Sequence, residues 1–581
     1  MRVPLGLFSL VLGLARGESL VAKEPEASLV TTTYGDVEGF IHVTPQRIPI
    51  HVFLGIRYGQ SPDIFNRFKK PEIVEKWAPM LHHAKTFKAA CIPYVELALG
   101  EENYSEDCLF LNVITPSTTA KDLPVYVFVH GGGFQVGSTA EYGYEKLAET
   151  IASKGIVVVT VQYRLGPFGF FSLGDQIAPG NMGLWDLTLA LHFLHEVLPS
   201  FGGDASRITI SGHSAGSAAA SALMLSPHSN DLLSQGFLMS GSAISEFALS
   251  DAVVEESKKL ATELGCYKES ATTSTIRCMQ EKTAHEIIQA VDKIGSSRAH
   301  PNFLKFHPRL DGDFFPHALE RLAKTTSPKR SVIGLTDMES ALFVLYPEVS
   351  FMSGLSIPET SWHNFSRKQL VDFIGEVVVT DEEHKEDAAA FRQILFDFYV
   401  NREEKKDDST FYLQRYIELV SDLEFLIPAY QEAQIKTVNK WPTFLYTIEH
   451  EAKSDRRVLH PVKGAYHADE LRHFTDGVKG LEEFEEDTAH SAFGAAFVDS
   501  ITNFVKRGDP SPSKSLDWPP LTKERPFQHL VFKGKTFFSK ETFRGEAADL
   551  WLRDVQKAVT GDKLRKSRLP GSEAHIVHTE L

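Results

Sequence analysis

The sequence predicts an α/β fold in which helices cover both faces of an open, mostly parallel sheet. Two features of its 581 residues support this prediction. Short runs of β-branched residues alternate with longer stretches of helical periodicity, as in folds built on a parallel sheet. The strand-like runs are apolar at almost every position, as in strands covered on both faces. The composition, 43% apolar and 23% charged, is that of a globular protein and excludes a disordered or fibrous one.

These patterns place the elements along the chain. We expect strands at residues 125–130, 156–161, 208–210, 236–239, 331–335 and 443–448, and helices at 184–198 and 215–225. Residues 251–329 and 348–438 are mainly helical in pattern. We interpret them as insertions over one end of the sheet, since binding pockets form outside the carboxyl ends of the strands.

The two ends of the chain predict its location. Residues 1–17 hold a basic residue, an apolar run and small residues at alternate positions, the pattern of a secretory signal peptide; a buried N-terminal strand or helix is the alternative. Residues 559–581 form a charged tail ending in His578-Thr579-Glu580-Leu581, one residue different from the retention signal His-Asp-Glu-Leu. We therefore expect a protein of the endoplasmic reticulum lumen, bound by a retention receptor, with secretion as the alternative.

Residues 18–558 are expected to form a single domain. No repeat or low-complexity linker divides them, and no stretch is apolar for long enough to cross a membrane. The formal net charge of −16 argues against general binding of nucleic acid, because that binding depends on neutralising phosphates. Two glycosylation sequons begin at Asn103 and Asn364, and a lumenal protein would carry glycans there if both are exposed.

The four cysteines fit an oxidising compartment. They allow three pairings, of which Cys91 with Cys108 and Cys266 with Cys278 close short loops that lose little entropy on closure. A metal site is the weaker alternative, because the sequence has no Cys-x-x-Cys and no histidine at zinc-finger spacing.

A strand, a sharp turn and a helix surround the motif Gly212-His213-Ser214-Ala215-Gly216. In this Gly-x-Ser-x-Gly pattern the serine takes a strained backbone conformation that holds its hydroxyl above the sheet, and the two glycines let strand and helix approach closely. The motif predicts Ser214 as a nucleophile, with an inert serine in a tight turn as the alternative.

A second turn, His130-Gly131-Gly132-Gly133-Phe134, follows the strongest expected strand. Three glycines at a strand end let backbone N–H groups point into a cavity with no side chain in the way, which is how an oxyanion hole is built. A flexible glycine loop would be the simpler interpretation of these residues alone, and the serine motif downstream favours the oxyanion hole.

A serine nucleophile needs a base and an acid that orients it, in the chain order serine, acid, histidine. The acid should follow a middle strand, and Asp337 and Glu339 both come just after the strand at 331–335. The base should lie in a strand-end loop in the last third of the chain, where the candidates are His450, His460, His467, His473 and His490. The spacing alone does not choose among them.

A series of motifs in a fixed order connects the chain to a known family. The motifs include Phe53-Leu54-Gly55-Ile56-Arg57-Tyr58, Glu106-Asp107-Cys108-Leu109-Phe110-Leu111-Asn112, His130 to Phe134, Gly180-Asn181-Met182-Gly183-Leu184, Phe201-Gly202-Gly203-Asp204 and Gly212 to Gly216. From about Val37 to Trp551 the chain resembles the type-B carboxylesterases, of the carboxylesterase/lipase and cholinesterase family.

The resemblance implies an α/β-hydrolase fold and a serine esterase that acts on small-molecule esters. It implies Ser214 as nucleophile, Glu339 as acid and His467, within Gly-x-x-His-Ala-Asp-Glu-Leu, as base. It also implies an oxyanion hole formed by the N–H groups of Gly132, Gly133 and Ala215. No metal or organic cofactor is implied.

The same resemblance supports the two cysteine pairings given above. It further implies a buried ion pair between Arg67 and Glu106. Many carboxylesterases of this family are also retained in the lumen by a C-terminal tetrapeptide, which agrees with the predicted location.

The chain departs from the family pattern near the nucleophile. The family usually has Glu before the serine, but here the residue is His213, and Leu187 stands where the family usually has Gln. A carboxylate beside the serine makes a site more negative, so its absence should weaken the attraction of cationic substrates. The segment from Ile92 to Asp107 lacks the Trp with which cholinesterases hold a quaternary ammonium. We therefore expect poor turnover of choline esters.

The predicted activity is hydrolysis of carboxylic esters, with broad specificity, through a covalent acyl-enzyme. One alternative is an acylglycerol lipase, whose activity would rise at a lipid interface. Another is a catalytically inactive lumenal binding or adhesion protein on an esterase scaffold. Covalent labelling of Ser214 by an organophosphate separates this last alternative from the two enzymes.

Overall fold

A computed structural model of the chain describes residues 26–62, 65–94, 103–295, 304–347, 355–401, 408–451, 453–454, 459–477, 487–540 and 545–555. The predicted signal peptide, residues 1–17, and the predicted retention tail, residues 559–581, lie outside these residues.

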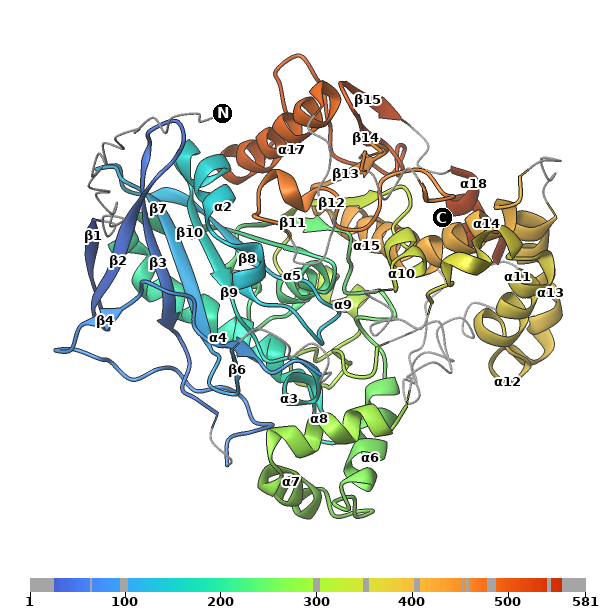
Figure 1. Cartoon of the computed structure of the whole chain (residues 1–581), viewed down its shortest axis with the longest axis horizontal. Coiled ribbons are helices and arrows are strands. Elements are labelled where there is room, and N and C mark those ends of the chain that lie inside the picture. Colours follow the sequence, from blue (N-terminus) through green and yellow to red (C-terminus); the bar gives the residue numbers. More distant parts are fainter. Residues whose placement is uncertain are drawn as a thin grey trace, which may run out of the picture.

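One mixed sheet of 13 strands forms the centre of the molecule, in the order β1-β2-β3-β7-β9-β8-β10-β11-β12-β13-β14-β15, with β4 beside β2 (Figure 1). The strands are β1 (Ala27–Thr32), β2 (Gly35–Val43), β3 (Pro49–Arg57), β4 (His82–His83), β7 (Phe110–Pro116), β8 (Leu123–Val129), β9 (Val157–Val161), β10 (Gly203–His213), β11 (Gln235–Met239), β12 (Arg330–Thr336), β13 (Thr443–Ile448), β14 (His529–Lys533) and β15 (Thr536–Lys540). The run from β9 to β14 is parallel throughout, while β1, β2, β3, β7 and β15 pair antiparallel with their neighbours along this order. A separate two-stranded sheet joins β5 (Ala90–Cys91) to β6 (Tyr104–Ser105).

The helices mostly follow strands, and several short turns of 3₁₀ or π geometry extend them. Their bounds are α1 (Thr139–Tyr142), α2 (Glu145–Thr150), α3 (Gly166–Phe170), α4 (Met182–Val197), α5 (Ala215–Leu225), α6 (Ala252–Glu263), α7 (Thr272–Glu281), α8 (Ala284–Lys293), α9 (Leu319–Thr325), α10 (Ala341–Leu345), α11 (Arg367–Phe373), α12 (Asp381–His384), α13 (Ala388–Leu395), α14 (Phe411–Ser421), α15 (Ile427–Val438), α17 (Thr488–Arg507) and α18 (Gly545–Asp549).

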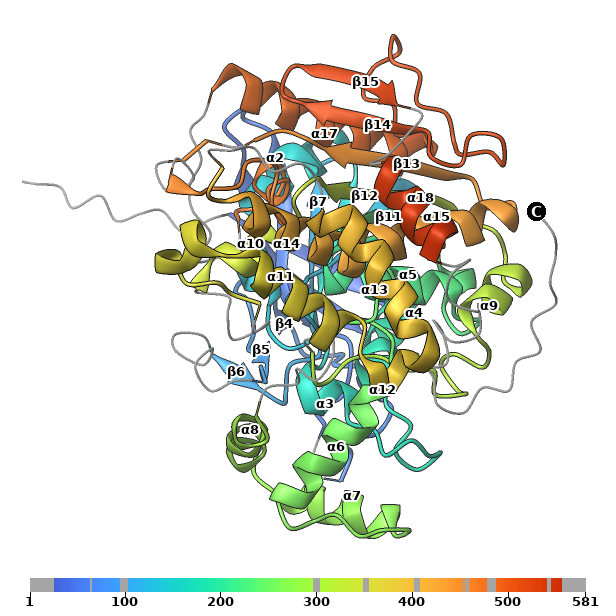
Figure 2. The same cartoon turned by 90° about the vertical axis from the view of Figure 1, so that its right-hand side faces the viewer.

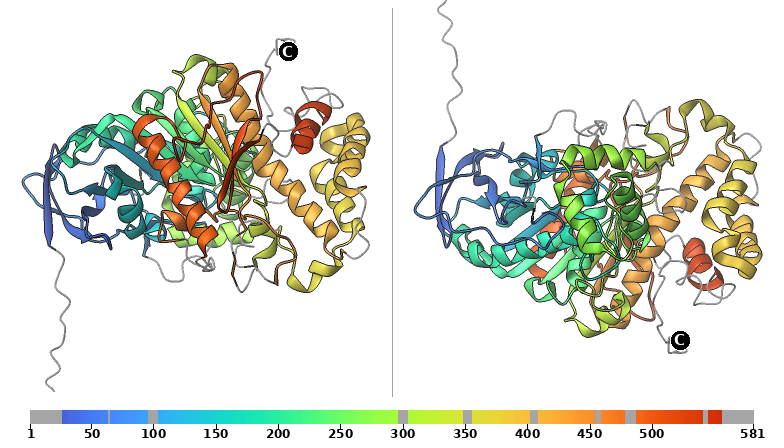
Figure 3. Two further views of the ribbon diagram at one scale, coloured as in Figure 1. Left: turned by 90° about the horizontal axis from the view of Figure 1, so that it is seen from above. Right: turned by 90° about the horizontal axis from the view of Figure 1, so that it is seen from below.

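The central strands are buried on both faces, as their apolar runs predicted. Because successive side chains of a strand point to opposite faces, Val127 of β8 packs in the layer of α4 and α5, and its neighbour Phe128 packs in the layer of α2 and α17. Seen from above, the orange helix α17 crosses one face of the sheet (Figure 3). The fold is thus a sheet between two helical layers.

The two helical insertions leave the sheet at neighbouring strands. Helices α6 to α8 follow β11, and α10 to α14 follow β12. Figure 1 places α6 to α8 at the bottom of the molecule and α11 to α13 at its right, and Figure 2 shows the same separation after a quarter turn. Both insertions therefore begin at the carboxyl ends of parallel strands, as expected from the helical pattern of residues 251–329 and 348–438.

The predicted elements agree with the structure in the centre of the sheet and miss its edges. Helix α5 and strand β13 have the predicted bounds, while β10 begins five residues earlier than the strand expected at 208–210. Strands β1, β2, β3, β7, β14 and β15 were not predicted; exposed positions interrupt the apolar runs of β1 and β15. In the described part of the chain, no helix has the length and hydropathy needed to cross a membrane.

Candidate active site

Ser214 lies at the sharp turn between β10 and α5. Its backbone angles, φ 59° and ψ −128°, are strained for a residue with a side chain. The Ser214 N–H donates to the carbonyl of Met239, at the end of β11, at 2.9 Å, and this bond ties the turn to the neighbouring strand. The local geometry is that of a nucleophile elbow.

The glycines around the serine are required by close backbone contacts. A Cβ atom on Gly216 would lie 2.1 Å from the carbonyl oxygen of Val129, and one on Gly212 would lie 2.3 Å from the backbone of Gly216. A Cβ on Gly241, after β11, would lie 2.1 Å from the Ser214 carbonyl oxygen. Only glycine allows β8, β10 and α5 to approach this closely. The motif therefore encodes the packing of the turn as well as its conformation.

The glycine loop after β8 lies beside the elbow. A Cβ on Gly131 would lie 2.8 Å from the His213 carbonyl oxygen and 3.1 Å from the Ser214 Cβ. Gly132 and Gly133 have φ values of 107° and 63°, which residues with side chains rarely adopt. The Gly132 carbonyl accepts from the N–H groups of Gln135 and Val136, each at 3.0 Å, and closes the loop.

Three backbone N–H groups remain available in this region. Within the ranges that the structure describes, the N–H groups of Gly132, Gly133 and Ala215 donate to no other protein group. Ala215 is the first residue of α5, so its N–H also lies at the positive end of a helix dipole. The family resemblance implies these three donors for an oxyanion hole.

Glu339 and His467 are in direct contact although 128 residues separate them along the chain. The His467 ring nitrogen Nδ1 lies 2.6 Å from Glu339 Oε2, and both side chains are buried. Glu339 Oε1 accepts from the Ser240 hydroxyl at 2.6 Å and from the Thr336 N–H at 2.7 Å. These two donors fix the carboxylate, and the carboxylate fixes the tautomer of the histidine.

The other acid candidate has a different contact. Asp337 Oδ1 accepts from the Ala465 N–H at 2.7 Å and so holds the loop that carries His467. The remaining histidine candidates lie in other packing groups: His460 packs against Tyr346 and Trp362, while His450, His473 and His490 contact one another. The structure thus joins Glu339 to His467, whose ring packs on that of His213, the residue before Ser214, and it places the other histidine candidates in separate packing groups.

Two further residues at the site carried no role in the sequence prediction. Ser240 orients Glu339, and only its position after a middle strand could have suggested it. Glu470 is fully buried, and its Oε1 lies 4.0 Å from Nε2 of His213, the residue before the nucleophile. Burial and the nearby Glu339 hold the pKa of Glu470 well above its usual range. Burial and His467 hold the pKa of His213 well below its usual range.

The walls of the site come from the helical insertions and are apolar. The His467 ring packs against Phe343 of α10 and Phe425, at ring-centroid distances of 5.1 and 4.9 Å. Leu304, in the first insertion, lies beside Gly133, where an added Cβ would contact its side chain at 3.2 Å. The first insertion therefore places an apolar side chain beside the glycine loop, and the segments after β12 place two beside the histidine.

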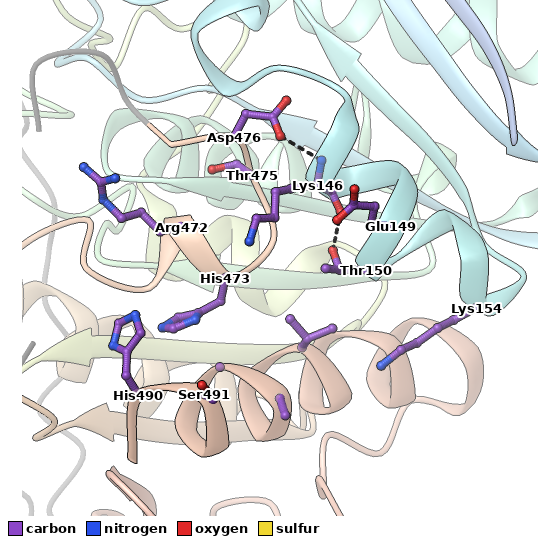
Figure 4. A pocket seen from close by; sticks show the side chains of 13 residues that line it. Lys146, Glu149, Thr150, Lys154, Arg472, His473, Thr475, Asp476, His490 and Ser491 are labelled. Atoms are coloured by element: carbon purple, nitrogen blue, oxygen red, sulfur yellow. Dashed lines mark hydrogen bonds between the residues drawn. The ribbon is translucent and has the colours of Figure 1, made fainter. Parts of the chain in front are cut away.

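A cavity of about 570 Å³ lies at the junction of α2 and α17 (Figure 4). None of the three predicted catalytic residues lines it. Its charged groups support the fold: the Asp476 carboxylate accepts from the N–H groups of Glu145 and Lys146 at the start of α2, and Lys154 pairs with Asp499 of α17 at 2.7 Å. Burial and repulsion from neighbouring basic groups lower the pKa of His473, on its wall, to about 3. The cavity marks the contact between two helices.

The remaining predicted residues can now be placed. Disulfides join Cys91 to Cys108 and Cys266 to Cys278. Arg67 is buried and forms a bidentate ion pair with Glu106, with Nε to Oε2 at 2.7 Å. The sequon residues Asn103 and Asn364 are both exposed. Among the described residues, no group of three or more His, Cys, Asp or Glu side chains is arranged to hold a metal ion.

Comparison with known proteins gives a consistent result over most of the chain. The family model described as "Carboxylesterase family" matches residues 26–551. The chain is 34% identical over 534 residues to gut esterase 1 of Caenorhabditis briggsae, covering 90% of this chain and 92% of that protein. It is 30% identical over 549 residues to acylcarnitine hydrolase of Mus musculus, covering 90% and 91%. It is 28% identical over 539 residues to bile salt-activated lipase of Bos taurus, covering 88% and 85%.

Proposed function

The chain belongs to the carboxylesterase family and is a carboxylic ester hydrolase with the α/β-hydrolase fold, and from this premise we propose that it acts through a Ser214–His467–Glu339 triad. The observation that carries the proposal is the 2.6 Å contact between buried His467 and Glu339 beside the strained elbow of Ser214. The ring of His467 lies 4.4 Å, centroid to centroid, from the ring of His213, which precedes the nucleophile.

In the first half of the reaction, Ser214 Oγ attacks the ester carbonyl carbon while His467 Nε2 takes the hydroxyl proton. Glu339, held by Ser240 and Thr336, accepts the Nδ1–H and stabilises the imidazolium that forms. The carbonyl oxygen becomes negative, and three backbone N–H groups stabilise it, those of Gly132, Gly133 and Ala215. The intermediate then expels the alcohol, which takes the proton from His467 and leaves an acyl-enzyme.

In the second half, a water molecule replaces the alcohol. It gives a proton to His467 as its oxygen attacks the acyl carbonyl, and the same N–H groups stabilise the second oxyanion. When this intermediate collapses, the proton returns to Ser214 Oγ and the carboxylic acid leaves. No group outside the chain and the water takes part in these steps.

The walls of the site support a preference for neutral esters with hydrocarbon acyl groups. Leu304, Phe343 and Phe425 offer apolar surface beside the glycine loop and the histidine. His213 replaces the carboxylate that the family usually places before the nucleophile, so the site lacks a negative charge that would attract a cation. Choline esters are expected to be poor substrates.

The deciding experiment is hydrolysis of p-nitrophenyl butyrate by the purified protein and by Ser214→Ala. We expect the substitution to remove all but background activity and to abolish labelling by an organophosphate. If both proteins hydrolyse the ester at background rate and the wild type takes no label, the triad mechanism is wrong. A rate that rises sharply on emulsified acylglycerol would instead favour the lipase alternative.

We also propose residence in the lumen of the endoplasmic reticulum, through a retention receptor that binds the C-terminal tetrapeptide. The two disulfides support an oxidising compartment. The tetrapeptide itself lies outside the described residues. Removing residues 578–581 should move the protein from cell extract to culture medium, as followed by immunoblotting. Retention of the shortened chain in the cell would contradict this proposal.

A further inference from the structure

His213 and Glu470 form a buried pair of ionisable groups with no role in the reaction proposed above. Glu470 is 0% exposed and His213 is 3% exposed. In the part of the chain that the structure describes, neither Glu470 carboxylate oxygen reaches a donor on another residue, and His213 Nε2 has no hydrogen-bond partner. The Glu470 carboxylate accepts from its own backbone N–H, and its Oε1 lies 4.0 Å from His213 Nε2.

An ionised carboxylate in this position would be costly. Burying a charge with no donor beyond its own backbone N–H is unfavourable, and Glu339 adds like-charge repulsion. The imidazole has the complementary problem, because burial and the neighbouring His467 disfavour its cation. A small rotation of either side chain would close the gap of 4.0 Å to hydrogen-bonding distance. If the two groups share one proton, neither an unbalanced carboxylate anion nor an unbalanced imidazolium cation is buried.

We propose that His213 and Glu470 share one proton as a second carboxylate–imidazole pair, which positions His467 and keeps a second negative charge away from the triad. The proton lies on Glu470 Oε1 with His213 neutral, or on His213 Nε2 with Glu470 ionised. The net charge of the pair is zero in both arrangements. The inference rests on the proposed triad, and His213 and Glu470 act as positioning residues.

The surroundings of the pair agree with this assignment. His467 packs on the His213 ring at 4.4 Å between centroids. The other ionisable side chains that act on Glu470 or are acted on by it are Glu339, Asp469, Tyr142 and Tyr446. Glu339 and Asp469 are acidic, so no cation other than His213 is present among these groups to balance Glu470.

The test uses two thioesters of the same shape, butyrylthiocholine and its uncharged carbon isostere 3,3-dimethylbutyl thiobutyrate. The thioester ratio is the kcat/KM value for butyrylthiocholine divided by that for the uncharged isostere. It reports the charge at the site and does not depend on the fraction of active protein. Because the pair is neutral, Glu470→Gln should leave this ratio within about twofold of the wild-type value. His213→Glu leaves two carboxylates with at most one proton, and should raise the ratio about tenfold.

The pH profile provides the second measurement. In His213→Glu the added negative charge favours protonated His467, so the acid limb of kcat/KM should move up by about one pH unit. In Glu470→Gln the acid limb of kcat/KM should stay at the same pH. The value of kcat should fall, because the pair no longer positions the His467 ring. Organophosphate titration counts the functional sites in each preparation.

Two results would overturn the shared proton. A fall of the thioester ratio in Glu470→Gln would mean that Glu470 is an isolated anion in the wild type. An unchanged ratio and pH profile in His213→Glu would mean that the pair does not act on the site. Failure of the wild type itself to take the organophosphate would instead reject the triad mechanism.

Discussion

At the scale of single residues, the site depends on which carboxylate contacts His467. Asp337 and Glu339 both follow β12, and only two residues separate them. Glu339 contacts the His467 ring at 2.6 Å, whereas Asp337 holds the backbone of the same loop through Ala465. Glu339 therefore orients the His467 ring, and Asp337 holds the backbone of the loop that carries it.

This division gives a matched pair of variants. Glu339→Gln keeps the shape of the side chain but cannot stabilise the imidazolium, and we expect kcat to fall about 10³-fold or more. Asp337→Asn keeps an oxygen that accepts from Ala465, so kcat should fall less than about tenfold, in line with the loss of charge from one hydrogen bond. Steady-state kinetics with p-nitrophenyl butyrate measure both. Equal losses in the two variants would contradict the assignment of the acid.

At the scale of elements, the contact of α5 with β8 and β10 positions the nucleophile. All residues of α5 are buried, and most are small. This composition lets the helix start directly on the sheet, with Gly216 against the backbone of β8 and Gly241 against Ser214. The helix thus directs its N-terminus at the glycine loop, where the oxyanion forms in the proposed reaction.

A substitution at each of two helix positions tests this contact. Gly216→Ala places a methyl group 2.1 Å from the Val129 carbonyl oxygen, so β8 and α5 must separate, at a cost of about 3 kcal/mol in unfolding free energy. Ala218→Gly, in the same helix, removes a methyl group and should cost about 1 kcal/mol through helix propensity. Chemical denaturation compares them. If Gly216→Ala is the milder change, the close approach is not what selects glycine here.

At the scale of the whole molecule, folding buries several neutral histidines. Burial lowers the pKa of His130, His307 and His529 to about 4 and, with repulsion from neighbouring basic groups, that of His473 to about 3. These histidines lie in different regions of the fold, so their lowered pKa values affect the stability of the whole molecule. Each prefers the neutral form in the folded state.

Stability should therefore fall as the pH drops from about 6.5 towards 4. In this range the unfolded chain binds protons at these histidines and the folded chain does not, so each contributes up to about 1.4 kcal/mol per pH unit. Glu470, whose pKa is raised, acts in the opposite direction but is a single group. Urea denaturation at a series of pH values measures the slope.

One variant isolates a single contribution to that slope. His529→Gln removes one buried histidine far along the chain from the triad, so the slope between pH 6 and 5 should decrease by about 1.4 kcal/mol per unit. A slope near zero in the wild-type protein over this range would show that the histidines are protonated in the folded state.

Much of the fold and the nucleophile could be predicted from the sequence, because the requirements are local. Apolar runs identified the central strands, and the glycines flanking Ser214 identified the elbow, since each reflects contacts within a few residues of itself. The edge strands β1 and β15 escaped prediction because their exposed positions break the apolar pattern. Glu470 escaped it because nothing in its neighbourhood along the chain marks a buried carboxylate that no other residue's donor reaches.

The sequence by itself determined the order of motifs, the family and the strained turn at Ser214. The family resemblance pointed to Glu339 and His467, and the tertiary structure showed their contact, gave Asp337 a different one and brought Glu470 to His213. The physical reason is distance along the chain. Residues next to one another in the sequence produce the backbone strain and the glycine contacts at Ser214. The hydrogen bond between Glu339 and His467, 128 positions apart, exists only after β12 and β13 have paired.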